Sequence, residues 1–316
     1  MPTYDLHILP RVRDSWSYLY VEHAIIEQDA KAIKVIDQDG TTPIPCAALS
    51  LLLLGPGTSI THAAIHSIAE CGCMIGWTGE QSVRFYAVGM GETRSAANIL
   101  HQAELHANPT SRMAIVRRMY EMRFPDPLDP DLTLRQIRGK EGIRVRELYS
   151  RWSRETEVEW TGRSYKQSDW NKAEPINRAL SAATSCIYGI AHAAIVAAGY
   201  SPALGFIHTG KMLSFVYDVA DLYKADIAIP VAFQCTASSP RQLETRVRRM
   251  CRDQIREQKM LERILEDLSG LFDVSSQHLA QAAQFDTNAA QPGALWNGEG
   301  EDEVDGGLNY AAYGEL

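Results

Sequence analysis

The sequence predicts an α+β protein, in which a small N-terminal β-sheet domain (residues 1–91) precedes a larger all-α helical domain (residues 92–281). Two patterns in the sequence lead to this prediction. Short runs of β-branched and aromatic residues, separated by turn signals, fill the first 90 residues. From about Ser95 onward, apolar residues recur with the period of a helix. The last segment, residues 282–316, is rich in Asn, Ala, Gly and acidic residues, which predicts a disordered acidic tail.

The N-terminal part contains several short strand patterns and one helix pattern. Asp39-Gly40 is a hairpin turn signal between two of the strands. The continuous apolar run Leu49–Leu54, ended by Gly55-Pro56-Gly57, predicts a strand that is buried on both faces. Thr61–Glu70 has the pattern of a short helix. The remaining strands are expected at Ser17–Val21, Ala24–Glu27, Ala32–Ile36, Thr42–Ile44, Met74–Trp77 and Val83–Val88.

The second part is expected to be helical throughout. Residues 179–210 contain no Lys, Arg, Asp or Glu, but Ser, Thr and Tyr side chains interrupt the apolar run. This pattern favours a buried central helix over a membrane span. Leu132–Arg154 is basic and predicts one long helix or a helix pair. The other helices are expected at Ser95–His106, Arg112–Arg123, Ile176–Ala198, Leu213–Lys224 and Pro240–Leu268.

The formal charge of −8 is unevenly distributed along the 316 residues. Residues 264–316 hold ten of the 39 acidic residues and no Lys or Arg, so the preceding part is slightly basic. Its charge therefore does not exclude a nucleic-acid partner. The six cysteines form no CxxC pair and no zinc-binding spacing, which indicates reduced thiols. Since the N-terminus lacks the pattern of a signal peptide, a cytoplasmic location is expected.

Candidate metal ligands are densest in residues 205–226. Asp218 and Asp221 are three positions apart, so a helix would project both carboxylates from one face. His208 precedes that helix, where a turn beyond Gly210 can fold the imidazole back. Carboxylates with one imidazole suit Mg²⁺ or Mn²⁺. The spacing alone also allows two solvated helix residues and a histidine that caps a turn.

Glu141 is a second candidate because glycines flank it at positions 139 and 142. Glycine in a helix costs about 1 kcal/mol relative to alanine. Its use here suggests that another backbone or a ligand approaches closely. The alternative is a surface glutamate that balances the neighbouring arginines.

Basic residues gather in two of the predicted helices. Such stretches suit a phosphate backbone, because each guanidinium can bind two oxygens. Solvated helices with internal ion pairs are the alternative. Together with the candidate metal ligands, these helices suggest phosphodiester chemistry. The basic residues are Arg135, Arg138, Lys140, Arg144, Arg146, Arg151 and Arg154 in the first helix, and Arg241, Arg246, Arg248, Arg249, Arg252, Arg256, Lys259 and Arg263 in the second.

Four stretches carry a resemblance to a known family: RGKEGIRVR, TGRSYKQSDW, INRALSAATSCIYGIAHAAIVAAGYSPALGFIHTGK and LSFVYDVADLYKAD. They resemble the integrase/endonuclease family that forms the catalytic subunit of CRISPR adaptation, in its type I-E form. The resemblance covers roughly residues 10–265. It implies an N-terminal β domain for dimerisation and contacts to DNA ends, followed by an α-helical catalytic domain.

The resemblance also implies the site residues. Glu141, His208 and Asp221 would bind Mg²⁺ or Mn²⁺, and Asp218 would assist them in catalysis. Five further positions would contact DNA: His23, Arg84, Arg163, Tyr165 and Lys211. From the basic helices, Arg138, Arg248, Arg249 and Arg252 are added as DNA contacts.

The implied reaction joins the 3′-hydroxyl ends of a captured protospacer to the CRISPR repeat by transesterification, with endonuclease activity from the same site. The implied partners are double-stranded DNA with frayed ends, CRISPR repeat DNA, a second copy of the chain and a small ferredoxin-like CRISPR adaptation protein. A host DNA-bending factor is compatible with this assembly, and no membrane is involved. Two rival hypotheses are a stand-alone nuclease for branched DNA and a non-catalytic DNA-binding scaffold.

Overall fold

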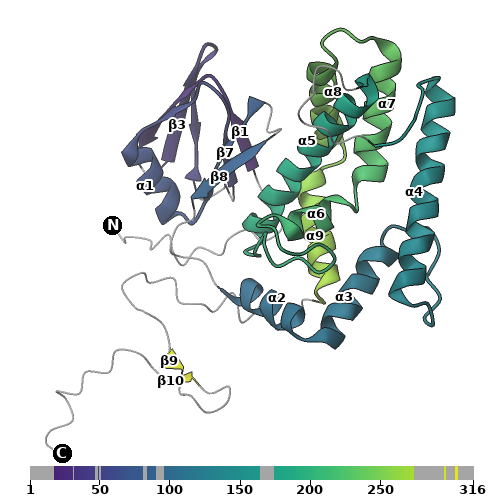
Figure 1. The fold of residues 1–316 in the computed structure, drawn as a ribbon. Helices are drawn as coiled ribbons and strands as arrows, with labels where there is room; N and C mark the ends of the chain where they lie inside the picture. The colour runs from purple at the N-terminus through teal and green to yellow at the C-terminus, as the bar shows by residue number, and fades with distance from the viewer. Residues whose placement is uncertain are drawn as a thin grey trace, which may run out of the picture.

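The fold is described from a computed structural model, and it confirms the α+β class predicted from the sequence (Figure 1). Strands dominate up to residue 89 and helices follow from residue 97. The predicted boundary at residue 91 and most of the segment 282–316 lie outside the described residues, so the domain limits stay a prediction. The described residues are 18–30, 32–46, 49, 51–80, 84–89, 96–163 and 174–273, with the paired strands β9 (Leu295–Trp296) and β10 (Glu303–Val304).

Two four-stranded sheets form the N-terminal part. The first has the order β1-β5-β7-β8, with the first three strands parallel and β8 antiparallel to β7. Its strands are β1 (Tyr18–Val21), β5 (Leu51–Leu54), β7 (Met74–Thr78) and β8 (Phe85–Gly89). The second has the order β4-β3-β2-β6. Its strands are β2 (Ile25–Asp29), β3 (Ala32–Asp37), β4 (Gly40–Ile44) and β6 (Ser59–Ile60).

Every strand predicted for this part is present, and only β6 was missed. Two residues are too few to show an alternating pattern, so β6 could not be recognised from the sequence. The one predicted helix is α1 (His62–Glu70). Its first turn is capped by Thr61, whose hydroxyl accepts a hydrogen bond from the backbone N–H of Ala64.

Strand β5 is buried on both faces, as its apolar sequence predicts. Leu52 and Leu54 pack among residues of the second sheet and of α1, whereas Leu51 and Leu53 pack with Met74 and with residues 193, 196 and 197 of helix α5 (Pro175–Ala197). Alternate residues of a strand point to opposite faces. The first sheet is thereby held between the N-terminal core and the helical part.

Helix α5 lies at the centre of the helical part, among the helices that follow it in the chain (Figure 1). It is long and apolar enough to cross a membrane by composition, but 67% of its most apolar window is buried inside the protein. This burial supports the prediction of a core helix. The other helices are α2 (Ala97–Ala107), α3 (Pro109–Glu121), α4 (Leu134–Thr156), α6 (Ser214–Ala220), the π-helix η4 (Lys224–Ala228), α7 (Ile229–Ser238), α8 (Leu243–Glu257) and α9 (Met260–Leu271).

The structure corrects the prediction for the C-terminal helices. The predicted helix Pro240–Leu268 is two helices, α8 and α9, because Lys259 has a left-handed backbone (φ 46°) that ends helical pairing. Helix α7 was missed. It has proline in its first turn, a position that a helix accepts, and its apolar sequence packs against α5 and α8. Leu132–Arg154 is the single helix α4, not a pair.

Candidate active site

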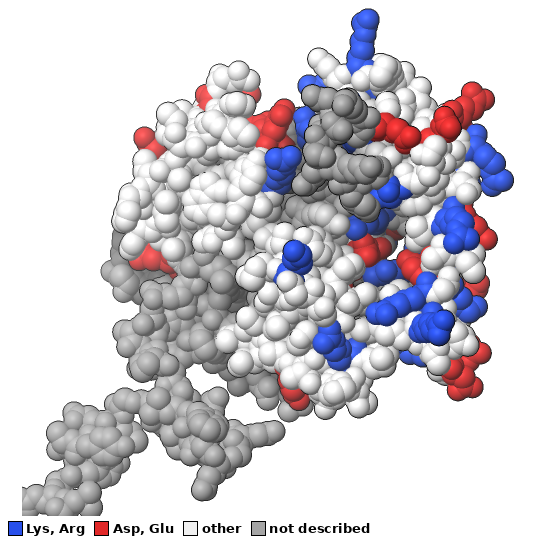
Figure 2. Space-filling view, viewed as in Figure 1, with Lys and Arg blue, Asp and Glu red and all other residues white. Residues whose placement is uncertain are grey.

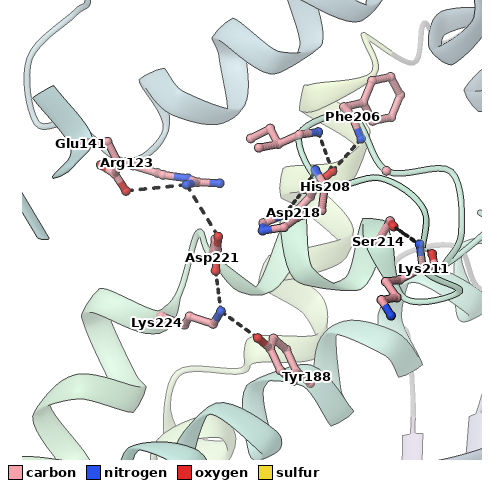
Figure 3. Close-up of polar contacts among 12 residues, drawn as sticks. Arg123, Glu141, Tyr188, Phe206, His208, Lys211, Ser214, Asp218, Asp221 and Lys224 are labelled. Atoms are coloured by element: carbon pink, nitrogen blue, oxygen red, sulfur yellow. Dashed lines mark hydrogen bonds and ion pairs between the residues drawn. The ribbon is translucent and has the colours of Figure 1, made fainter. Parts of the chain in front are cut away.

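Asp218 organises the segment that precedes helix α6 (Figure 3). Its side chain is fully buried and accepts hydrogen bonds from the backbone N–H groups of Phe206 (2.6 Å), Ile207 (3.0 Å) and His208 (2.8 Å). Val216 and Val219 of the same helix are also buried and anchor it in the core. Asp218 therefore fixes the backbone on which the histidine is mounted.

The imidazole of His208 is held by the same carboxylate. Its Nδ1 lies 2.6 Å from Oδ1 of Asp218, so the turn folds the histidine back as the sequence suggested. The hydrogen bond to Asp218 raises the pKa of His208, although burial opposes the charged form. With Nδ1 as donor, the lone pair of Nε2 is available to a ligand. The side chain is 43% exposed, so a ligand can reach it.

Glu141, from α4, lies between two arginines. Arg144 donates two hydrogen bonds to it, from Nε (2.8 Å) and Nη2 (3.0 Å). Nη1 of Arg123 lies 3.6 Å from Oε1 of Glu141 and 3.9 Å from Oδ2 of Asp221. Arg123 follows the end of α3, so three helices meet at this point.

Asp221, at the C-terminal end of α6, is paired with Lys224. Nζ of Lys224 lies 2.5 Å from Oδ1 of Asp221 and also donates to the hydroxyl of Tyr188 (3.0 Å). Burial favours the neutral amine, but Asp221 and Tyr188 raise the pKa of Lys224 above its usual value. The lysine therefore stays protonated and neutralises Asp221.

One cavity of about 470 Å³ is lined by Glu141, Asp221 and the cations beside them, whereas His208 and Asp218 are not among its lining residues. On the face shown in Figure 2, Lys and Arg side chains gather over the helical part, around a hollow beside α4. The β-sheet part shows few of them. The charged and hydroxyl-bearing residues that line the cavity are Arg123, Glu141, Arg144, Tyr149, Arg163, Ser181, Thr184, Ser185, Tyr188, Asp221 and Lys224.

The predicted metal ligands are near one another but do not form a closed ligand set. Among the described residues, no three His, Cys, Asp or Glu side chains are grouped closely enough to hold a metal ion. Arg123 lies between Glu141 and Asp221, and His208 lies beside them with Asp218 (Figure 3). The donor types nevertheless fit Mg²⁺ or Mn²⁺, since a carboxylate that orients a histidine through Nδ1 is the usual support of a metal-bound imidazole.

The close approach of another backbone that was suggested for the glycines beside Glu141 is not seen among the described residues. A Cβ atom added at Gly139 or Gly142 would meet nothing within 4 Å. No described backbone therefore approaches Gly139 or Gly142. The described residues do not explain why glycine stands at these two positions.

The predicted DNA contacts lie in different parts of the molecule. Arg163 lines the cavity and donates to the backbone carbonyl of Asn177 and the hydroxyl of Ser181. Lys211 is exposed and does not line the cavity. Tyr165 lies outside the described residues. The others are exposed or partly exposed: His23 and Arg84 on the β-sheet part, Arg138 on α4, and Arg248, Arg249 and Arg252 on α8.

Sequence reasoning missed three cavity residues as members of the site. Arg144 and Lys224 each follow a predicted ligand by three positions on a helix, so the spacing of charged pairs could have identified them. Arg123 has no such local signal. Its partners are far away in the sequence and come from two other helices.

A known protein family matches most of the chain. The family model described as CRISPR associated protein Cas1 matches residues 17–126 and 126–247. The chain belongs to the Cas1 family. The matched ranges include all four candidate catalytic residues, Glu141, His208, Asp218 and Asp221.

Individual Cas1 proteins match most of the chain. CRISPR-associated endonuclease Cas1 2 of Thermus thermophilus is 53% identical over 309 residues, which cover 97% of this chain and 93% of the relative. CRISPR-associated endonuclease Cas1 of a Clostridium species is 39% identical over 307 residues, covering 96% and 98%. A crystal structure described as a TtCas1-DNA complex superimposes with a TM-score of 0.77 at 57% identity and covers 84% of this chain and 99% of its own. The Cas1 fold thus spans both parts of the chain.

Proposed function

We propose that this Cas1 protein is a metal-dependent DNA integrase of CRISPR adaptation with an associated endonuclease activity. It joins the 3′-hydroxyl ends of a captured protospacer to the CRISPR repeat by transesterification. One observation carries the proposal: Glu141 and Asp221 come from separate helices to a cavity lined by three arginines and a lysine, and Asp218 orients His208 on the segment that precedes α6. The endonuclease names of its relatives and the DNA bound in the TtCas1 structure support it.

Glu141, His208 and Asp221 are the residues that would hold the ion, Mg²⁺ or Mn²⁺. When bound, the ion supplies Lewis acidity, which lowers the pKa of the attacking hydroxyl and offsets charge on the phosphate. Asp218 keeps the imidazole oriented, with Nε2 as the acceptor. Arg144 and Lys224 hold the two carboxylates in position. Positioning of this kind supplies much of the catalysis in phosphoryl transfer.

The proposal includes the partners and the location inferred from the sequence. We infer that the protein acts in the cytoplasm as a homodimer, in the type I-E form, with a small ferredoxin-like CRISPR adaptation protein. A host DNA-bending factor is a further candidate partner. The exposed arginines of α4 and α8 would bind the DNA backbone, because guanidinium groups pair well with phosphate oxygens.

A strand-transfer assay tests the catalytic assignment. Glu141→Ala, His208→Ala and Asp221→Ala should each abolish joining of a labelled duplex to a supercoiled array plasmid, in the presence of the small partner and Mg²⁺ or Mn²⁺. Duplex binding should remain nearly intact, because the basic helices supply the affinity. Arg138→Ala is the matched control, and it should weaken binding without abolishing joining. Joining by any of the first three variants at the wild-type rate would refute the assignment.

The same assay separates the rival functions. A stand-alone nuclease would cut branched DNA equally well without the small partner and would yield no joined product. A non-catalytic scaffold would bind DNA and show neither activity. The integrase requires joined products that depend on both the partner and the metal ion.

A further inference from the structure

Arg123 is a buried cation whose hydrogen-bonding groups are unused. Its side chain is 5% exposed, and its Nε and Nη2 are buried without a partner among the described residues. Its Nη1 lies 3.6 and 3.9 Å from two carboxylates, which is too far for hydrogen bonds. Its remaining contact places the guanidinium 5.0 Å above the ring of Tyr120. Buried polar groups of folded proteins are almost always paired, so this guanidinium needs a partner that is not part of the described chain.

The free edge of Arg123 has the geometry of an oxyanion site. Nε and Nη2 form one side of the guanidinium and present two parallel N–H groups, which match two oxygens of a phosphate or carboxylate. Arg144, in the same cavity, uses the same edge to bind both oxygens of Glu141 at 2.8 and 3.0 Å. Arg123 presents this edge without an occupant among the described side chains.

The charges around Arg123 favour an external anion over a structural ion pair. Glu141 and Asp221 each have a closer cation, since Arg144 lies 2.8 Å from the first and Lys224 lies 2.5 Å from the second. The described cavity wall holds four cationic side chains, Arg123, Arg144, Arg163 and Lys224, against these two carboxylates. Arg123 is therefore not needed to neutralise the two carboxylates. The cavity wall carries an excess of positive charge, which favours the binding of an anion.

We propose that Arg123 binds the DNA phosphodiester at which the reaction occurs, through the edge formed by Nε and Nη2. The inference rests on the proposed function, which brings a phosphodiester into this cavity. Both nitrogens are buried in this structure, so binding requires the Arg123 side chain to turn and expose this edge to the cavity. This movement breaks no hydrogen bond, because Nη1 lies 3.6 and 3.9 Å from the two carboxylates.

Binding measurements that combine a change in the DNA with a substitution of Arg123 test this contact. We would measure binding, without divalent ions, of branched DNA with a natural or an uncharged methylphosphonate linkage at the branch point. The methylphosphonate should weaken binding to the wild type roughly 10- to 100-fold, since it removes a charge-assisted pair of hydrogen bonds. It should weaken binding to Arg123→Met by less than about threefold, because the partner is already absent. Arg123→Lys, which keeps the charge but not the fork, should give an intermediate ratio.

Arg138→Met is the matched control, because Arg138 is exposed on α4 and does not line the cavity. It should lower the affinity for both DNAs and leave the ratio between them at the wild-type value. If Arg123→Met also keeps the wild-type ratio, Arg123 does not bind this phosphodiester. A wild type that neither joins nor cuts DNA would instead refute the proposed function.

Thermal melting without DNA or metal separates this role from a structural one. Arg123→Met removes a buried charge whose Nε and Nη2 have no hydrogen-bond partner among the described residues, so its Tm should fall by no more than about 2 °C. A large fall in Tm would mean that Arg123 stabilises the fold through Glu141 and Asp221, and this result would overturn the proposal.

Discussion

At the scale of single residues, Asp218 and Asp221 show how one side-chain type serves two purposes within one helical turn. Asp218 is fully buried and holds three backbone N–H groups and an imidazole. Asp221 is 24% exposed and lines the cavity. The first carboxylate supports the local fold, whereas the second is available for a ligand.

This difference predicts losses of stability of different size for two neighbouring substitutions. Asp218→Ala should lower the free energy of unfolding by ~2–4 kcal/mol, because it leaves several donors unpaired. Asp221→Ala should lower it by ~1 kcal/mol, since Lys224 keeps its bond to Tyr188. Urea denaturation measures both. Equal losses for the two variants would show that Asp218 has no special structural role.

At the scale of elements, the helix that carries Asp221 is linked to α7 through the π-helix η4. Lys224 begins η4 and reaches back to Asp221 and Tyr188. π-helical segments are rare and occur often at functional sites. Here the wider turn lies at the cavity and carries the cation that neutralises Asp221.

A second contact between helices predicts that part of the free energy of unfolding depends on pH. Nε of Arg178 on α5 lies 2.7 Å from Oε1 of Glu244 on α8, and this hydrogen bond lowers the pKa of Glu244. A carboxyl whose pKa is lower in the folded state stabilises it above the unfolded pKa of 4.5, and the effect disappears as pH falls through the folded value. Glu244→Gln should therefore lower the free energy of unfolding by ~1 kcal/mol at pH 7.

The loss should vanish in acid. Once the pH falls below the lowered pKa of Glu244 in the folded state, the variant and the wild type should unfold at similar denaturant concentrations. Glu257→Gln, at an exposed position on the same helix, is the control and should have little effect at either pH. A loss that does not change with pH would rule out the charged pair as its cause.

At the scale of the whole molecule, the β-sheet part packs on α5, where the ring of His192 contacts Phe85 of β8 at a tilt of 50°, with ring centroids 4.5 Å apart. Burial lowers the pKa of His192 from its usual 6.5 to about 4. Between these pH values the unfolded chain binds a proton that the folded chain does not. Stability should therefore fall as pH decreases from 6.5 to 4.

The His192→Leu variant should lose part of this acid sensitivity. Since one pKa unit corresponds to about 1.4 kcal/mol, removing His192 should reduce the fall in unfolding free energy by up to ~3 kcal/mol over this range. Denaturation at pH 7, 5.5 and 4 measures the effect. An unchanged slope would show that His192 is readily protonated in the folded protein.

The acidic segment at the C-terminal end predicts a change in DNA binding for the whole chain. Deleting residues 286–316 should leave folding and dimerisation unchanged, because the segment has no sustained apolar periodicity. It should modestly strengthen non-specific DNA binding, since acidic charge is removed from a protein with basic helices. Titrations at one fixed salt concentration measure this change, and a large fall in Tm would contradict the prediction.

Local patterns in the sequence determined most of the secondary structure. The buried strand Leu51–Leu54, the core helix α5 and the turn that returns His208 to Asp218 all follow from patterns within about 25 residues. The same patterns failed at Lys259, where a left-handed residue breaks a continuous amphipathic sequence. They failed again at α7, whose apolar residues show no helical period of their own.

The sequence by itself determined the α+β class, the family resemblance and the four candidate catalytic residues. Only the tertiary structure decided that Arg123, at the end of α3, lies between Glu141 of α4 and Asp221 of α6. That arrangement depends on how α3, α4 and α6 pack in the shared helical core, and no local periodicity specifies such packing. Contacts within a helix follow from its repeat, whereas contacts between helices depend on which faces the shared core buries.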